Sequence, residues 1–281
     1  MGNEALRRFS GGRRRAIGLV AAALALLAPQ GSRATNSNGK FERKLAVEGP
    51  VDVDVQTAAG NISVRMVAGS SVRVSGEVRV KTGLLQSDPV SERKLQQIIS
   101  HPPIQQHGNS IIIGRVHDSD LRRDVFISYE IEVPADTRLR SNTGLGDLHV
   151  EGLHGTVTAD TGAGKVTISG VRGDVHANTG MGDVVIREVT GTLRAESVAG
   201  NVSAEGEPGG TWRLITRLGD VRVHLLGGAG LDLHVETGLG EILTKFPFKV
   251  EGAISHQLHG KVRGGGHLVE LKSGTGSIHI E

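Results

Sequence analysis

The sequence predicts an all-β protein of the β-solenoid class, wound in coils of about 18 residues with two strands each, and one short inserted helix near residues 88–99. The first observation is a tandem repeat: "TGAGKVTISGVRGDVHAN" (161–178) is followed at once by "TGMGDVVIREVTGTLRAE" (179–196). Each copy has a Gly-rich corner, an alternating strand, a Gly and a second alternating strand. The second observation is that apolar and polar residues alternate between glycines along most of the remaining chain, which is typical of strands and turns.

Residues 1–34 have the order of a secretory signal peptide. Five arginines within the first 15 residues precede the apolar run "AIGLVAAALALLA" (16–28), and Pro29 and the small residues of "SRA", ending at Ala34, follow it. The run is shorter than the ~20 apolar residues that span a bilayer as a helix. We therefore expect export, to the periplasm or to the cell surface or exterior. A retained anchor and a twin-arginine export route remain open alternatives.

The charge balance changes once this leader is set aside. The formal net charge is +2, and the six Arg and one Glu of residues 1–34 contribute +5 of it, so residues 35–281 carry −3. Aromatic residues make up only 2% of the chain. A basic face with stacking aromatics is therefore missing, and we expect no nucleic-acid partner. The chain has no Cys, so an exported form must be stabilised by burial and backbone pairing alone.

Residues 35–135 are expected to form N-terminal strands with one inserted helix. In "SDPVSERKLQQII" (87–99), Asp88 can cap a helix and Pro89 suits its first position. The predicted apolar face of this helix consists of Val90, Leu95, Ile98 and Ile99. Residues 136–281 hold the repeats, and 35–281 together are expected to be one continuous domain without a membrane-spanning segment.

The repeats align on a Thr/Ser-x-x-Gly corner that recurs at intervals of 18, 18, 18, 19 and 21 residues. These corners begin at Thr143, Thr161, Thr179, Ser197, Thr216 and Thr237. Ser273 lies 36 residues beyond Thr237, which predicts one degenerate coil between them, and Thr57 opens a similar coil far upstream. Such a period predicts coils that bury their apolar faces against their neighbours.

Alternation within the coils predicts which side chains face inward. Val175 should stack between Val157 and Leu193, and His176 should face outward. Because the interior is narrow and aliphatic, we expect no room for aromatic rings. The corner glycines should supply positive φ angles. The Thr at each corner should bond the Thr of the next coil in a hydroxyl ladder.

The residue after the second corner Gly is often acidic, which raises calcium as a candidate ligand. This column reads Asp147, Lys165, Asp183, Asn201, Asp220, Glu241 and Ser277. Calcium-binding β-rolls also place Asp after Gly-rich corners. However, Lys165 and Ser277 interrupt the carboxylates, and Ca²⁺ takes about six to eight oxygen ligands. The column is expected to turn the chain rather than to bind metal.

The 12 histidines give no zinc site by spacing. Those at outward strand positions are His149, His176, His224, His234 and His279. The column through His149 continues as Thr167, Val185, Ser203, Arg222 and Leu243. His256, His259 and His267 lie close in sequence, but zinc needs three or four converging ligands. We assign no catalytic, cofactor-binding or metal-binding residue, and no cofactor.

An enzymatic alternative rests on the corner carboxylates. Some parallel β-helices are polysaccharide lyases or hydrolases that carry paired acidic groups. Asp147 and Asp183 are two coils apart, or about 9–10 Å at the usual strand spacing, which would suit an inverting pair. However, Gly-Asp is also a common turn sequence, so these carboxylates have a structural explanation. Aromatic platforms for a sugar are scarce as well, because Trp212 and Tyr129 are the chain's single Trp and single Tyr.

The sequence resembles a known family along nearly all of residues 40–281. The segment "TGLGDLHVEGLHGTVTADTGAGKVTISGVRGDVHANTGMGDVVI" (143–186) looks like the repeats of the bacterial putative-adhesin domain family of unknown function (DUF4097, LiaG-like). The segments "FERKLAVEGPVDVDVQTAAGNISVRMVAGSSVRVSGEVRV" (41–80) and "YEIEVPADTRLRSNTGLGD" (129–147) look like its other strands. The resemblance implies a β-solenoid and an envelope-associated or surface protein. It supplies no catalytic or binding residues.

Together these features predict a non-enzymatic, exported, adhesin-like β-solenoid. We expect an interaction or scaffold role, with a cell-envelope protein or glycan as the partner. The alternatives are a carbohydrate-active β-helix enzyme and a calcium-dependent β-roll.

Overall fold

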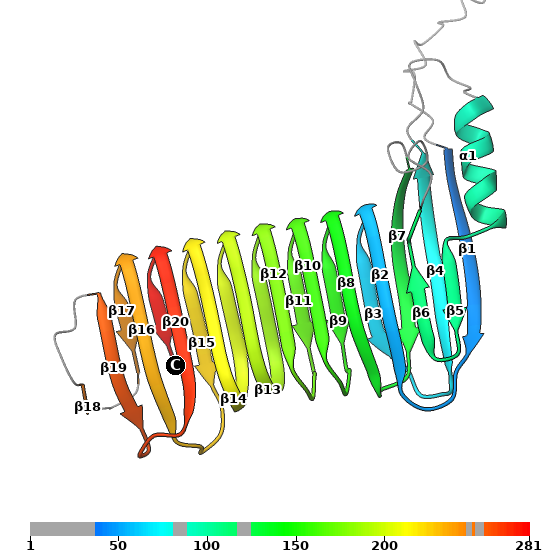
Figure 1. Cartoon of the computed structure of the whole chain (residues 1–281). Coiled ribbons are helices and arrows are strands. Elements are labelled where there is room, and N and C mark those ends of the chain that lie inside the picture. Colours follow the sequence, from blue (N-terminus) through cyan, green and yellow to red (C-terminus); the bar gives the residue numbers. More distant parts are fainter. Residues whose placement is uncertain (1–36, 81–88, 117–124, 246–248, 251–255) are drawn as a thin grey trace, which may run out of the picture. The chain divides into compact units, whose positions relative to one another are not determined.

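Stacked parallel strands make up most of the described chain (Figure 1). The computed structural model describes residues 37–80, 89–116, 125–245, 249–250 and 256–281, all within one compact unit, 34–281. The predicted leader, 1–34, lies outside the described residues, as does the predicted cap Asp88. The all-β class and the solenoid are confirmed.

The elements before the repeats are β1 Ser37–Ala46, β2 Val51–Ala59, β3 Ile62–Met66, β4 Ser71–Val80, α1 Pro89–Ser100, β5 Ile104–His107, β6 Ser110–Ile113 and β7 Val125–Val133. The strands of the first repeats are β8 Thr137–Leu145, β9 Leu148–Glu151, β10 Val157–Ala163, β11 Val166–Ser169, β12 Val175–Met181, β13 Val184–Ala199, β14 Val202–Leu218 and β15 Val221–Leu225. The last strands are β16 Leu231–Leu239, β17 Ile242–Thr244, β18 Lys249–Val250, β19 Gln257–Val262, β20 His267–Thr275 and β21 Ile278–Ile280.

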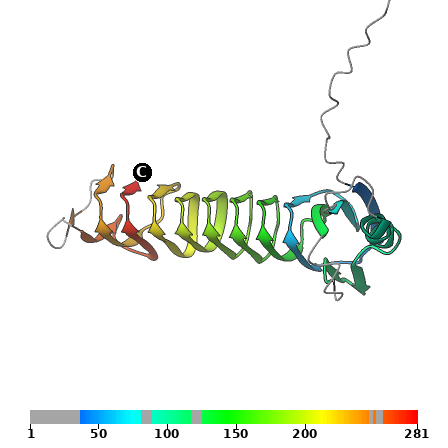
Figure 2. The same cartoon turned by 90° about the horizontal axis from the view of Figure 1, so that it is seen from above.

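Consecutive coils pair in parallel and in register. Thr143, Thr161 and Thr179 lie opposite one another on β8, β10 and β12. The predicted upstream coil is part of the same stack, because Thr57 of β2 lies opposite Thr143. Figure 2 shows the same coils side by side in a second view.

The order of the coils at the C-terminal end differs from the sequence order. The last coil, β20–β21, lies between the coil of β14–β15 and the coil of β16–β17, so Ser273 is opposite both Thr216 and Thr237. The predicted degenerate coil is wrong: β19 instead pairs antiparallel with β16 and covers its other edge. Because every corner has the same backbone geometry, the final coil can insert between two earlier ones without a change of register.

The N-terminal end of the stack is built from antiparallel strands. β7 runs parallel to β3 and antiparallel to β4, and β4 pairs antiparallel with β1. The helix near residues 88–99 is confirmed as α1, which packs on β1 and β4 through buried Leu95 and Ile98. The predicted inward position of Val90 is wrong, because its side chain is exposed.

The inward columns follow the predicted alternation. Val175 lies in register between Val157 and Leu193 and is buried, whereas His176 is exposed. The prediction that rings have no room inside is wrong at Trp212, which is fully buried opposite Leu193. A Cβ added at Gly206 would lie 2.6 Å from the Val189 carbonyl oxygen and 3.2 Å from the indole, and the indole N–H donates to the Gly191 carbonyl at 2.9 Å.

The two glycines of a corner have different functions. Gly182 has a φ of 137°, as predicted, whereas Gly180 is outside the left-handed region. A Cβ added at Gly180 would lie 2.5 Å from the Gly162 carbonyl oxygen of the neighbouring coil. The first corner glycine therefore suits a close backbone approach rather than a positive φ, and Val198 and Arg217 occupy the equivalent position in the next two coils.

The hydroxyl ladder between corner Thr residues is not formed. Thr161, Thr179 and Ser197 instead each donate to the carbonyl of the second corner Gly of the preceding coil, at 2.9 Å in each case. These carbonyls belong to Gly146, Gly164 and Gly182. The hydroxyls are buried and need a partner, and a backbone carbonyl at each coil supplies it.

Val175→Asp should unfold the chain. The substitution places a carboxylate between two buried aliphatic side chains, at a cost of more than about 3 kcal/mol. His176→Asp, the adjacent outward position, should leave the fold intact. Circular dichroism of both variants checks this, and equal loss of the β signal in the two would contradict the inward and outward assignment.

Candidate functional site

The corner carboxylates singled out in the sequence bond the backbone of the next coil. Asp147 Oδ1 accepts from the Lys165 amide at 2.8 Å, and Asp183 Oδ1 accepts from the Asn201 amide at 2.8 Å. Asp220 Oδ1 likewise accepts from the Ser277 amide at 2.9 Å. Each acidic group is therefore directed along the stack, which is a structural use of the carboxylate that the sequence did not indicate.

Neutral residues continue the same ladder where the column has no acid. Asn61 and Asn201 accept through their side-chain oxygens from the amides of Asp147 and Asp220, both at 2.9 Å. The Ser277 hydroxyl accepts from the Glu241 amide at 3.2 Å. Lys165 interrupts the ladder, because an ammonium group cannot accept a hydrogen bond. This corner position therefore uses a hydrogen-bond acceptor, which can be charged or neutral.

The inserted last coil places His279 between Arg222 and Leu243, which the sequence order had made neighbours. His279 and His224 thereby line one outward groove of about 280 Å³ on β13, β14, β15 and β21. Its charged and polar lining includes Arg187, Glu205, Arg222, His224, His279 and Glu281.

Most of these charges have partners. His224 Nδ1 lies 4.0 Å from Glu205 Oε1, and Arg222 bonds Asp220 at 2.9 Å. The ammonium of Lys245, 2.9 Å from Glu281, holds the pKa of that carboxyl below its usual range. The groove is open and polar, and it carries charges of both signs. It can therefore contact a polar partner, but neither sign of charge is concentrated in it.

The remaining histidines do not converge. His259 lies opposite His234, with ring centroids 4.8 Å apart and nearly perpendicular planes, whereas His267 lies opposite Leu231. His149 lies in register with Ser63 and Thr167, and His176 with Thr158 and Arg194. Among the described residues, no group of three or more His, Asp or Glu side chains is placed to hold a metal ion.

An exposed apolar ridge runs along the corner of the stack. It consists of the residue between the two corner glycines, or its equivalent, in each coil. In spatial order the ridge reads Ala59, Leu145, Ala163, Met181, Ala199, Leu218, Thr275 and Leu239. Ala59, at one end, is buried, and Thr275 is the polar member. Its four large side chains are between 57% and 68% exposed.

Large and small side chains alternate strictly along this ridge. The large ones recur every second coil, at a spacing of about 9.6 Å. In sequence order the alternation fails, because Leu239 follows Leu218 directly. Insertion of the last coil places Thr275 between them and restores it. The alternation of large and small side chains can be recognised only when the coils are placed in their spatial order.

Comparison with known proteins identifies the family. The model of the family described as Toastrack DUF4097 matches residues 32–281. The chain therefore belongs to this family, as the resemblance of its repeats implied. The sequence matches no curated protein. Within the part of the chain that the structure describes, no helix has both the length and the apolar character needed to cross a membrane.

Three solved structures are similar to this chain over 86% of its length. A protein of Clostridium sporogenes described as a putative cell adhesion protein is 16% identical, with 99% of its chain covered and a TM-score of 0.33. A putative adhesin of Bacteroides fragilis is 14% identical, with 97% covered and a TM-score of 0.39. A putative adhesin of Parabacteroides merdae is 9% identical, with 96% covered and a TM-score of 0.29.

Lys165→Asn should stabilise the protein. The new amide oxygen can accept from the Asp183 N–H and complete the corner ladder, a gain of about 0.5–1.5 kcal/mol. Lys165→Ala is the matched control, because it removes the ammonium without adding an acceptor. Urea unfolding of the three proteins measures the difference in stability. Identical unfolding midpoints for the Asn and Ala variants would contradict a stabilising hydrogen bond from the new amide oxygen.

Proposed function

We propose that this protein is an exported interaction module of the cell envelope that acts by contact and not by catalysis. The observation that carries the proposal is the exposed apolar ridge. Contiguous apolar surface on a soluble protein is a common mark of a protein-binding site. The four large side chains offer apolar area that a partner would remove from water on binding.

The form of the ridge favours a protein partner. Leu and Met side chains separated by Ala notches offer shape to an apolar surface, whereas sugar rings are usually held by aromatic platforms and hydrogen bonds. The chain's single Trp is fully buried and the single Tyr is 1% exposed. Neither provides a surface platform for a sugar.

Catalysis by the corner carboxylates finds little support. Asp147 and Asp183, the basis of the enzymatic alternative, each hold a backbone amide of the neighbouring coil. Several outward charges also have salt-bridge partners: Arg213 lies 2.6 Å from Glu270, and Lys272 lies 3.3 Å from Glu236. Groups held in this way are poorly placed to transfer protons to a substrate.

The location is the part of the proposal that rests on sequence. The arginines, the apolar run and the small residues before Thr35 support cleavage of residues 1–34 on export. We propose that the working protein is residues 35–281, a single adhesin-like domain in the periplasm or on the cell surface. The resemblance to envelope-associated proteins is in line with this location.

The ridge is tested by replacing three of its four large side chains together. The variant Leu145→Ser, Met181→Ser and Leu218→Ser should fold normally, because these residues are exposed, and should bind isolated envelopes at least tenfold more weakly. The loss follows from the ~1.5–3 kcal/mol that burial of each such side chain contributes. The matched control replaces Met66, Leu226 and Leu243, exposed apolar residues off the ridge, with Ser.

The measurement is cosedimentation of the exported, purified protein with envelopes, together with N-terminal sequencing. Equal binding by the two triple variants would contradict the ridge as the contact surface. Turnover of polyuronides or other envelope glycans, abolished by Asp147→Asn or Asp183→Asn, would contradict the non-catalytic proposal. An intact N-terminus in a cytosolic fraction would contradict export.

A further inference from the structure

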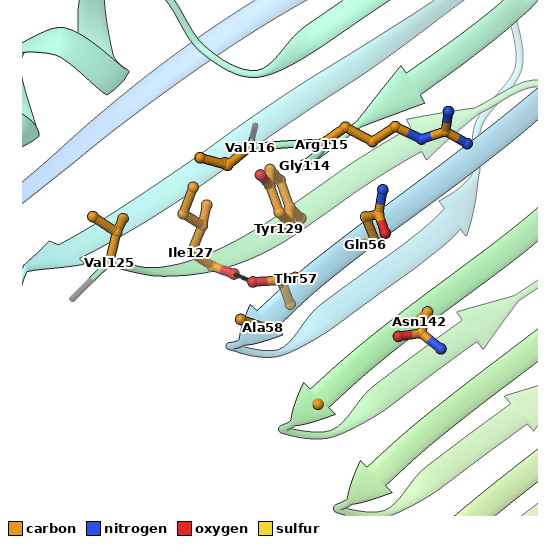
Figure 3. A pocket seen from close by; sticks show the side chains of 11 residues that line it. Gln56, Thr57, Ala58, Gly114, Arg115, Val116, Val125, Ile127, Tyr129 and Asn142 are labelled. Atoms are coloured by element: carbon orange, nitrogen blue, oxygen red, sulfur yellow. Dashed lines mark hydrogen bonds between the residues drawn. The ribbon is translucent and has the colours of Figure 1, made fainter. Parts of the chain in front are cut away.

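A pocket of about 430 Å³ lies where the repeats meet the antiparallel N-terminal strands (Figure 3). It forms because β6 pairs with β2 only as far as Val55, whereas β8 follows β2 to Ala59 on the opposite side. Beyond Val55 the edge of β2 is no longer paired by β6: Gly114 lies beside the Gln56 carbonyl, and the Thr57 hydroxyl donates to the Ile127 carbonyl at 3.0 Å. This volume is within the range of about 300–1,000 Å³ typical of small-molecule sites.

The Tyr129 hydroxyl lies at this pocket without a hydrogen-bond partner among the described residues. The side chain is 1% exposed, and burial raises the pKa of its hydroxyl, which therefore stays protonated as a donor. The ring is fixed by an edge contact with Phe41, with centroids 6.3 Å apart. An unsatisfied buried hydroxyl is costly and uncommon in folded proteins, and a ligand acceptor would satisfy it.

Gly114 leaves room in front of this hydroxyl. Its φ is 83°, and an added Cβ would lie 3.2 Å from the Tyr129 oxygen and would clash with the Gln56 carbonyl. Figure 3 shows the hydroxyl beside Gly114 and Val116, among the residues that line the pocket.

The lining has an apolar side and an amide side. Ala58, Val116, Val125 and Ile127 form the apolar side. The side chains of Gln56 and Asn142 supply primary amides, each with donors and an acceptor. The one charged lining residue among the described ones, Arg115, bonds Asp54 at 2.7 Å, and its guanidinium extends away from Tyr129 (Figure 3).

We propose that this pocket binds the acetamido group of an N-acetylated sugar. A neutral ligand is favoured because the charged group at the pocket is already paired. The acetamido methyl would lie against the Val and Ile side chains, and its carbonyl would accept from the Tyr129 hydroxyl. The amides of Gln56 and Asn142 would bond the sugar hydroxyls. The inference rests on the proposed envelope function, since it places the protein among acetylated glycans.

The experiment is calorimetric or saturation-transfer titration of the full chain with N-acetylglucosamine, with glucosamine and glucose as matched sugars. Only the N-acetylated sugar should bind. Tyr129→Phe keeps the ring and removes the hydroxyl, and should weaken binding at least tenfold. Asn142→Ala should weaken it severalfold. Asn178→Ala is the matched control, because Asn178 occupies the same outward column two coils away and does not line the pocket.

The stability of the variants separates binding from folding. Tyr129→Phe removes an unsatisfied buried hydroxyl, so its melting temperature should equal or exceed that of the unchanged protein. Absence of N-acetylglucosamine binding, or binding unaffected by Tyr129→Phe, would overturn the inference, as would equal affinity for glucose. Ridge-dependent envelope binding that survives in such a case would leave the proposed function standing, so the two failures can be told apart.

Discussion

In-register stacking of one coil upon the next is the constraint from which the other features of this fold follow. Parallel strands in neighbouring coils lie about 4.8 Å apart, so each position of a coil meets its own equivalent in the next. At the corner the backbones of neighbouring coils approach closely, so a Cβ added at Gly180 would lie 2.5 Å from the Gly162 carbonyl oxygen. Inside the coil, the same constraint stacks buried side chains on one another, as for Val157, Val175 and Leu193, and the buried Trp212 continues this column.

Polar groups at the corners are used to satisfy the backbone of the adjacent coil. The buried hydroxyl of Thr179 donates to the Gly164 carbonyl, and the carboxylate of Asp183 accepts from the Asn201 amide. These two bonds run along the stack and recur with Ser or Asn in place of Thr or Asp. Hydrogen-bonding capacity at each position therefore matters more than charge. The repeated Gly-Asp corners therefore have a structural use within the stack.

Because the corner groups bond the backbone of the adjacent coil, the surfaces that remain are formed by side chains that the stack leaves outside. The alternating ridge of Leu, Met, Ala and Thr is one of these surfaces. The polar groove at His224 and His279 is a second one, and it exists only because the last coil enters between two earlier ones. The pocket at Tyr129 arises at the end of the stack, where β6 stops short and the repetition ends.

The sequence alone predicted the coils, the inserted helix and the inward position of Val175, because period and alternation are local properties. It could not predict the order of the coils: corners that share one geometry can stack in any order, so the position of Ser273 between Thr216 and Thr237 depends on the whole chain. The partners of the corner Thr and Asp were missed for a related reason, since both bonds join residues of different coils. The burial of Trp212 was missed as well, because the partner of its indole N–H, the Gly191 carbonyl, lies on the neighbouring coil.

The measurement that tests the account most directly is disulfide formation in this Cys-free chain. With the last coil inserted, Arg222 and His279 lie in adjacent strands, and Arg222 and Leu243 are two strands apart. Adjacent strands fall within the ~4.4–6.8 Å Cα separation that a disulfide spans, and a two-strand distance exceeds it. The account predicts that Arg222→Cys with His279→Cys forms an intramolecular disulfide and that Arg222→Cys with Leu243→Cys does not. The reverse result would mean that the coils stack in sequence order, and it would contradict both the groove and the strict alternation of the ridge.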